Sequence, residues 1–130
     1  MDASRVAILN KFLKLGSSRD LASLEAMVSR DLRIEQADSL PFGGVYIGWA
    51  GYLDVTQKLF GKMRKIDLEL IDTWDGQQRS LVAHFMLNAI SKRTQEKISM
   101  PLLEIWEFEG DKVSAIKPYY HDTHLLSELL

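Results

Sequence analysis

Glu104 stands in a segment whose apolar residues recur at every second position. The residues that share its parity are Met100, Leu102, Trp106 and Phe108. Side chains two residues apart point to the same side of a strand, so a strand here would bury the carboxyl among apolar groups. Desolvation disfavours the anion, and we therefore expect a raised pKa for Glu104. A neutral carboxylic acid in such a pocket can donate a hydrogen bond to a developing oxyanion. The structural alternative pairs Glu104 with a Lys or Arg, or places it at the sheet edge.

Asp38 is the second residue with the chemistry of a catalytic group. It follows Leu32, Ile34 and Gln36 at alternate positions, which predicts an inward-facing side chain at the end of a strand. An ionised Asp at that place can act as a base on a carbon next to a carbonyl. The alternative is a turn residue that opens the segment 38–41 and binds nearby backbone amides.

Seven further residues are candidates for the wall of the same pocket. His84 shares its strand parity with Met86 and Asn88, and it is either part of the pocket wall or a hydrogen-bonded core histidine. Tyr120 is expected to point inward, and Tyr46 belongs either to a lid over the pocket or to the core. The predicted substrate-binding set is Tyr46, His84, Met86, Asn88, Leu102, Trp106 and Tyr120.

No metal site or cofactor site is predicted. His121, Asp122 and His124 lie close together, but three adjacent ligands without a distant fourth make poor coordination geometry. Asp122 or Thr123 is expected instead to cap a short C-terminal helix. The chain lacks the Gly-rich phosphate-binding motif and the Ser nucleophile elbow, and it contains no cysteine.

The elements that position these side chains follow from hydrophobic periodicity. Helices are predicted over 4–15 and over 49–62. Between them a further helix is predicted to begin at a cap formed by Ser18 or Asp20. Strands are predicted over 31–38, 66–70, 80–91, 98–109 and 113–120, with turns at 40–44, 75–76 and 110–111. The strand 80–91 is apolar on both parities, which calls for a core on one side and a second cover, such as a partner subunit, on the other.

This order of elements predicts the fold class and the domain organisation. Runs of helices followed by hairpin-linked strands are typical of an α+β domain, with helices packed on one face of a curved, mostly antiparallel sheet. The 130 residues are expected to form a single domain over 1–130, large enough to bury a core without metals or disulfides.

Composition narrows the range of partners and locations. Sixteen Lys and Arg residues against eighteen Asp and Glu residues give a net charge of −2, which argues against a dedicated nucleic-acid binder. The N-terminal apolar run is too short for a signal peptide, and no stretch is long enough to span a membrane. We therefore expect a cytoplasmic location and neither a membrane nor a nucleic-acid partner.

Three motifs in this order resemble the SnoaL-like polyketide cyclases and ketosteroid isomerases of the nuclear-transport-factor-2-like (NTF2-like) superfamily. They are the segments 41–48 (PFGGVYIG), 104–113 (EIWEFEGDKV) and 117–123 (KPYYHDT), and the resemblance covers nearly the whole chain. It implies a cone, in which a strongly curved sheet wraps around N-terminal helices and encloses an apolar pocket. It also implies a homodimer that packs sheet face against sheet face.

The same resemblance suggests roles for three residues. Ketosteroid isomerases place an Asp base at the end of the first strand, where Asp38 falls, and a protonated carboxylic acid two residues before an aromatic, as Glu104 stands before Trp106. The position of their catalytic Tyr in the first helix is occupied here by Phe12, so half of the isomerase oxyanion hole is missing and steroid isomerisation is not expected.

Three functions remain open from the sequence. The first is a cofactor-free isomerase, cyclase or lyase that transfers protons on an apolar carbonyl compound, with Asp38 as base and Glu104 as acid. The second is a non-catalytic binding module for an apolar small molecule. The third is a dimeric adaptor that recognises another protein through its sheet face.

Overall fold

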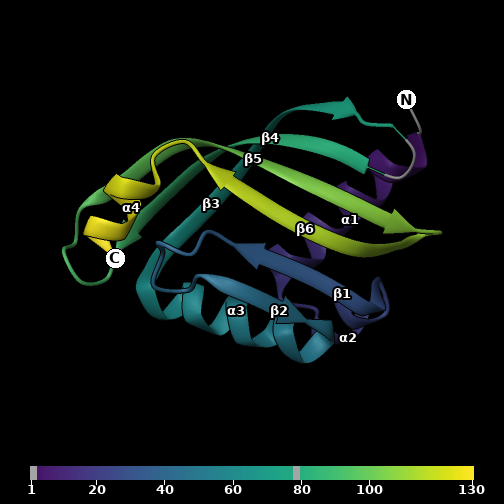
Figure 1. Ribbon diagram of the computed structural model, residues 1–130, viewed down its shortest axis with the longest axis horizontal. Coiled ribbons are helices and arrows are strands. Elements are labelled where there is room, and N and C mark those ends of the chain that lie inside the picture. Colours follow the sequence, from purple (N-terminus) through teal and green to yellow (C-terminus); the bar gives the residue numbers. More distant parts are fainter. Residues whose placement is uncertain (1–2, 78–79) are drawn as a thin grey trace.

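The computed structural model describes residues 3–77 and 80–130, and in these residues it has four helices and six strands (Figure 1). In chain order the elements are α1 (Ala3–Ser18), α2 (Leu21–Glu25), β1 (Val28–Gln36), β2 (Gly44–Ile47), α3 (Gly48–Lys62), β3 (Met63–Asp75), β4 (Ser80–Ser91), β5 (Lys97–Glu109), β6 (Lys112–Tyr120) and α4 (Thr123–Leu129). None of the helices in these ranges combines the length and the apolar character needed to cross a membrane.

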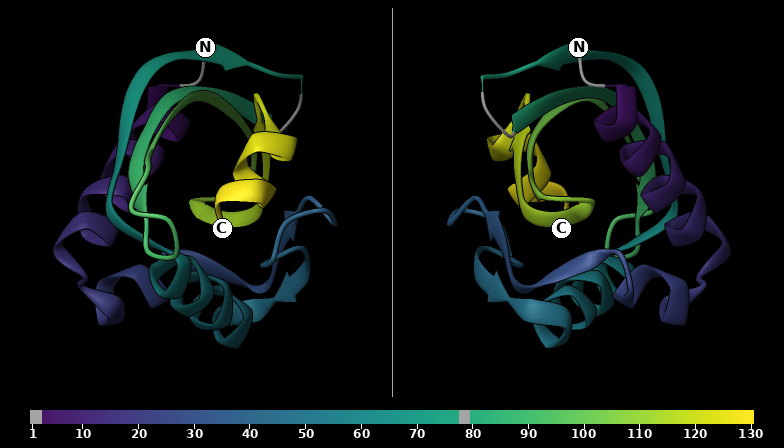
Figure 2. Two further views of the ribbon diagram at one scale, coloured as in Figure 1. Left: turned by 90° about the vertical axis from the view of Figure 1, so that its left-hand side faces the viewer. Right: turned by 90° about the vertical axis from the view of Figure 1, so that its right-hand side faces the viewer.

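The strands form one mixed sheet in the order β2-β1-β6-β5-β4-β3. β1 and β6 run parallel, with Ile34 opposite Ile116, and the other neighbouring pairs are antiparallel. The sheet curls strongly without closing (Figure 2). The predicted α+β class with a curved, mostly antiparallel sheet is therefore confirmed.

The two faces of the sheet differ in what they pack against. Odd-numbered residues of β4 from Leu81 to Ala89 and even-numbered residues of β5 from Ile98 to Phe108 are buried on the concave face. α1 lies on that side, where the Phe12 ring meets Trp106 edge-on at a centroid distance of 5.2 Å. The opposite parities form the convex face. Two-residue periodicity thus decides which side chains can reach the interior.

The helix ends follow from local capping. The Asp20 carboxylate accepts a hydrogen bond from the backbone N–H of Ser23 at 3.2 Å and caps α2. The Asp122 carboxylate accepts from the N–H of Leu125 at 2.9 Å and caps α4, as one of the predicted alternatives had it. α4 is fixed in turn by Ser91, whose hydroxyl donates to the Leu129 carbonyl at 2.6 Å.

One strand was missing from the prediction. The segment 40–44 was expected to be a turn, and β2 follows it directly and pairs antiparallel with β1. β2 has four residues between a glycine and a helix, which is too short for a period of two to be recognised.

Candidate functional site

Glu104 lies near the middle of β5 on the concave face, and the residue is 8% exposed. Its neighbours across the sheet are Ala83 on β4 and Pro118 on β6, neither of which carries a charge. The indole N–H of Trp106 donates a hydrogen bond to Glu104 Oε1 at 2.9 Å. Among the described residues this indole is the hydrogen-bond partner of the carboxyl, so Oε2 is left for a ligand or for water.

Burial sets the protonation of this carboxyl. Desolvation raises the pKa of Glu104 to about 7, and the Trp106 hydrogen bond opposes part of that rise. Because Oε1 accepts the indole N–H, the proton of the neutral acid belongs on Oε2. In its neutral form Glu104 is therefore a hydrogen-bond donor in an apolar surrounding, and near neutral pH it exchanges that proton readily.

The carboxyl faces a cavity of about 360 Å³ between the sheet and the helices α1 and α3. Arg19 and Asp67, the charged residues of its rim, are exposed. Most of the remaining lining is apolar, and it comprises Phe12, Leu13, Ile34, Tyr52, Val55, Leu59, Phe60, Ile66, Leu68, Trp106, Ile116 and Pro118. Such a wall suits an apolar ligand that offers a single polar group to Glu104.

Gln36 brings a second polar group to this cavity. It ends β1 on the concave face, is 5% exposed, and lines the same cavity as Glu104. Its Oε1 accepts a hydrogen bond from the Tyr120 hydroxyl at 3.0 Å. Burial raises the pKa of Tyr120 above its ordinary value, and the nearby Glu104 charge raises it further. Sequence reasoning placed Gln36 on the inward face but assigned it no role, although a polar residue on a buried parity was the available signal.

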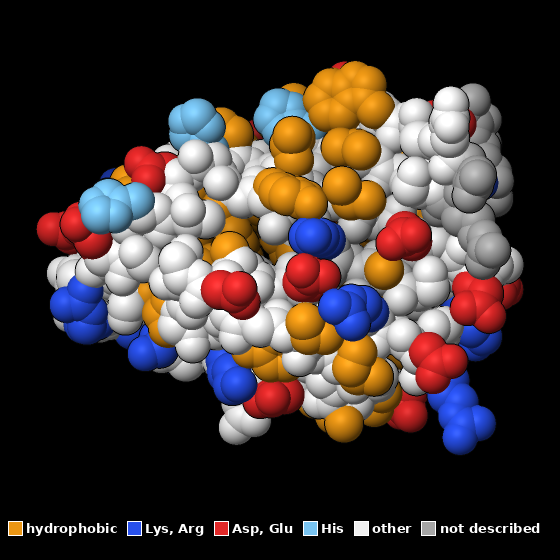
Figure 3. Space-filling view, viewed as in Figure 1, with side chains coloured by type: hydrophobic (Ala, Val, Ile, Leu, Met, Phe, Trp, Pro, Cys, Tyr) orange, Lys and Arg blue, Asp and Glu red, His pale blue; other side chains and the backbone are white. Residues whose placement is uncertain are grey.

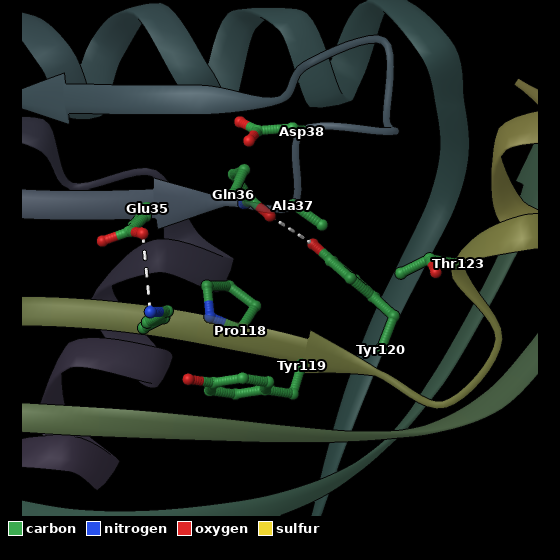
Figure 4. Close-up of a pocket in the computed structure, with 9 residues that line it drawn as sticks. Glu35, Gln36, Ala37, Asp38, Pro118, Tyr119, Tyr120 and Thr123 are labelled. Carbon is green, nitrogen blue, oxygen red and sulfur yellow. Dashed lines mark hydrogen bonds and ion pairs between the residues drawn. The ribbon is translucent and has the colours of Figure 1, made fainter.

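Asp38 lines a different cavity, of about 350 Å³, at the ends of β1 and β6 (Figure 4). The Glu104 cavity and this one share Gln36 and Pro118 in their walls. Asp38 is exposed, in a turn where the Leu40 N–H donates to the Ala37 carbonyl at 3.1 Å. Asp38 and Glu104 therefore line two different cavities, and the prediction that they share one pocket is corrected. β1 ends at Gln36, and parity no longer governs side-chain direction beyond that residue.

His84, Met86 and Asn88 lie on the convex face of β4, away from the Glu104 cavity. The His84 ring stacks on Trp74 of β3 at a centroid distance of 5.9 Å. The expectation that these three residues line the pocket is corrected here. Because β4 is apolar on both parities, its sequence pattern does not reveal which face turns inward.

The remaining predicted wall residues are divided between the cavities and the core. Trp106 lines the Glu104 cavity, and Tyr120 lines the neighbouring cavity, its hydroxyl bonded to Gln36. Tyr46 is buried beside α3, and its hydroxyl donates to the Phe42 carbonyl at 2.7 Å. Leu102 is buried opposite Tyr120 in the register of β5 and β6. Tyr46 and Leu102 thus have the contacts of core residues.

The His124 side chain has an ordinary structural partner. His124 Nε2 lies 3.0 Å from a Glu128 carboxylate oxygen, one helical turn away. In the part of the chain that the structure describes, no group of three or more His, Asp or Glu side chains is arranged to hold a metal ion.

Comparison with known proteins identifies the fold. No known family model matches the chain, and no curated protein matches it. Among solved structures, an NTF2-like protein of unknown function from Burkholderia pseudomallei K96243 is 12% identical, with 97% of this chain and 96% of that chain covered and a TM-score of 0.85. The structure of TerC, co-crystallised with polyporic acid, is 14% identical, with 97% of each chain covered and a TM-score of 0.85.

A third structure carries another small ligand. It is a protein with a ketosteroid isomerase-like fold from Catenulispora acidiphila DSM 44928 in complex with trimethylamine, and it is 10% identical, with 95% of this chain and 93% of that chain covered and a TM-score of 0.76. These likenesses cover nearly the whole chain and show a shared fold. The expected resemblance to the NTF2-like superfamily is thereby confirmed at the level of the fold.

Proposed function

We propose that this chain, with its NTF2-like fold, binds an apolar carbonyl compound in the Glu104 cavity and transfers a proton to the oxygen of that compound. The observation that carries the proposal is the state of Glu104. The carboxyl is buried in an apolar wall, its Oε1 is held by the Trp106 indole, and Oε2 has no partner among the described residues. With a pKa of about 7, this group is protonated in a large share of molecules at neutral pH.

The proposed reaction is acid-assisted enolisation. The proton on Glu104 Oε2 moves to the carbonyl oxygen while a C–H bond next to the carbonyl breaks. The electron pair of that C–H bond forms the C=C bond of the enol, and the released proton passes to a water molecule at the cavity mouth. Glu104 is left as a carboxylate and regains its proton from solvent. An acid whose pKa lies near the working pH is suited to this exchange.

The groups that face Glu104 support a neutral acid. The groups around its carboxyl are uncharged at neutral pH. They are Trp106 on β5, Tyr52 on α3, Gln36 on β1, and Tyr120 on β6, which is hydrogen-bonded to Gln36. Arg19 and Asp67 are exposed at the rim, where solvent screens their charges. Burial is accordingly the main cause of the raised pKa. The small ligands bound by TerC and by the Catenulispora protein support small-molecule binding on this fold.

Deuterium exchange of 1-tetralone, an apolar ring ketone, tests the proposal. We expect the protein to accelerate exchange next to the carbonyl in D2O, and the acceleration to fall as pH rises through about 7. Glu104→Gln keeps a donor but cannot release a proton, so we expect it to lose about a hundredfold of the acceleration. NMR measures the exchange, and Glu107→Gln, an exposed carboxylate on the other face of β5, is the control. Equal rates in wild type and Glu104→Gln would contradict the proposal.

A second function is binding without chemistry. The observation that favours it is the position of Asp38, which lines the neighbouring cavity and leaves the Glu104 cavity without the expected base. In that case 1-tetralone binds, exchange is not accelerated, and Glu104→Gln retains its affinity.

We also propose that the chain forms a homodimer through the convex face of the sheet. Large apolar side chains are exposed there, among them Trp74, Leu103 and Tyr119, each between 40% and 49% exposed. Figure 3 shows hydrophobic side chains gathered over β4 and β5. A second copy of the same face would cover this apolar surface.

A further inference from the structure

The Gln36 amide is held in one orientation by a single hydrogen bond. A primary amide has an oxygen that accepts and a nitrogen that carries two N–H donors. The Tyr120 hydroxyl donates to Oε1, and among the described residues Nε2 has no hydrogen-bond partner. The amide therefore presents unpaired donors from a buried position in a cavity wall.

Tyr120 keeps its donor role over the whole neutral range. Burial is the main cause of its raised pKa, and the Glu104 charge adds to it, so the hydroxyl remains protonated. With this hydroxyl donating to Oε1, the amide lies with Nε2 turned away from Tyr120. The orientation of Gln36 thus depends on a residue of the neighbouring cavity.

Gln36 and Glu104 flank the same residue of the sheet. Glu104 lies opposite Pro118 on β6. Ile34 lies opposite Ile116 in the parallel register of β1 and β6. Two residues further along each strand, the same register brings Gln36 beside Pro118. The two side chains therefore rise from strands on either side of β6, with backbones about 10 Å apart at the usual strand spacing. Both point to the concave side, and both are long enough to approach one ligand atom above Pro118.

We propose that Gln36 is a specificity-determining residue whose Nε2 donates a hydrogen bond to the same ligand oxygen that Glu104 binds, and that Tyr120 is the positioning residue for the amide. The inference rests on the proposed function and names its substrate class. Two donors converging on one atom select a compound with an acceptor oxygen, such as a ring ketone or its enol. They discriminate against amines and hydrocarbons of the same shape.

The test compares two ligands of one shape. 1-Tetralone carries an acceptor oxygen and tetralin does not, so the ratio of their affinities isolates recognition of the oxygen. Titrations at pH 6, where Glu104 is mostly protonated, are followed at the Trp106 indole N–H signal by NMR. We expect Gln36→Met, which keeps the length but removes the donors, to lower the ratio about tenfold with the affinity for tetralin unchanged.

Two further variants separate positioning from packing. Tyr120→Phe keeps the ring and frees the amide, so it should lower the same ratio several-fold. Tyr119→Phe makes the identical change on the convex face and should leave the ratio unchanged. If Gln36→Met does not fold, Tyr120→Phe decides the matter alone. A ratio that stays at the wild-type value in the folded variants overturns the inference.

The outcome also distinguishes this inference from the proposed function. Glu104→Leu removes the acid and leaves Gln36 in place. If Glu104→Leu lowers the ratio and Gln36→Met does not, Glu104 binds the oxygen alone and the role of Gln36 is refuted. If neither variant changes the ratio, or neither ligand binds the wild type, both proposals fail.

Discussion

Burying Glu104 costs folding free energy whenever the carboxyl is ionised. The unfolded chain has an ordinary Glu pKa near 4.5, whereas the folded pKa is about 7. Between these values the folded state binds more protons, so the free energy of unfolding falls as pH rises. A carboxyl at this buried position therefore costs stability at neutral pH. Such a cost is typical of functional sites.

Glu104→Gln should therefore change the pH dependence of stability. From pH 5 to pH 8 we expect wild type to lose about 2 to 3 kcal/mol of unfolding free energy relative to the variant, since each pKa unit is worth about 1.4 kcal/mol. Urea denaturation at both pH values measures the difference. Glu107→Gln, exposed on the opposite face of β5, is the matched control and should follow wild type. A constant difference between Glu104→Gln and wild type would show that the folded pKa is ordinary.

At the residue scale, the sequence predicted some positions and missed others for physical reasons. The alternation in 98–109 is unbroken, so parity alone predicted that Glu104 and Trp106 share the inward face. The role of Gln36 depends on the Tyr120 hydroxyl, a contact between residues 84 positions apart that no local pattern contains. Asp38 lies beyond Gln36, the last residue of β1, where strand parity no longer predicts the direction of a side chain.

At the scale of elements, the turn after β1 places Asp38 in the cavity next to that of Glu104. The chain leaves β1 at Gln36 and returns in β2 from Gly44, and Gly43 packs tightly between them. A Cβ on Gly43 would meet the backbone of Ala37 and approach Asp38 Cα to 2.9 Å. This turn has no room for a side chain at position 43, and its conformation determines where Asp38 lies.

Gly43→Ala should consequently destabilise the protein by about 1 to 3 kcal/mol, because backbone atoms must move to admit the methyl group. Gly61→Ala is the contrast, since Gly61 lies in α3 with open space around its Cβ position. There the substitution should stabilise by about 0.5 to 1 kcal/mol. Thermal and chemical unfolding measure both variants. Equal effects at the two positions would refute the tight packing of the turn.

The elements were predicted best where one face of the strand is polar. β5 alternates between buried and exposed residues, and its orientation followed from its sequence. β4 carries Val82, Met86 and Ile90 on one parity and Leu81, Phe85 and Leu87 on the other. Both assignments of its inner face were compatible with that pattern. The register with β5, where Ala83 lies opposite Glu104, settles the choice.

At the scale of the whole molecule, a second subunit would explain why the convex face of β4 is apolar. Val82, Met86 and Ile90 are half-buried on that face, and Leu103 of β5 lies beside His84 in the register. A strand that is apolar on both sides is typical of a sheet covered on both sides. The helices and the core cover the concave side, and we expect a partner subunit to cover the convex side. The proposed homodimer supplies this cover without any further partner.

Leu103→Glu should break this dimer. The substitution places a charge in the middle of the proposed interface, where burying it unpaired is unfavourable. We expect the wild type to sediment as a dimer and the variant as a monomer in analytical ultracentrifugation at micromolar concentration. Leu125→Glu is the matched control, because Leu125 is 41% exposed on α4, close to the 40% of Leu103. It should remain dimeric. A wild type that is monomeric, or a Leu103→Glu variant that stays dimeric, would exclude the convex face as the interface between two copies.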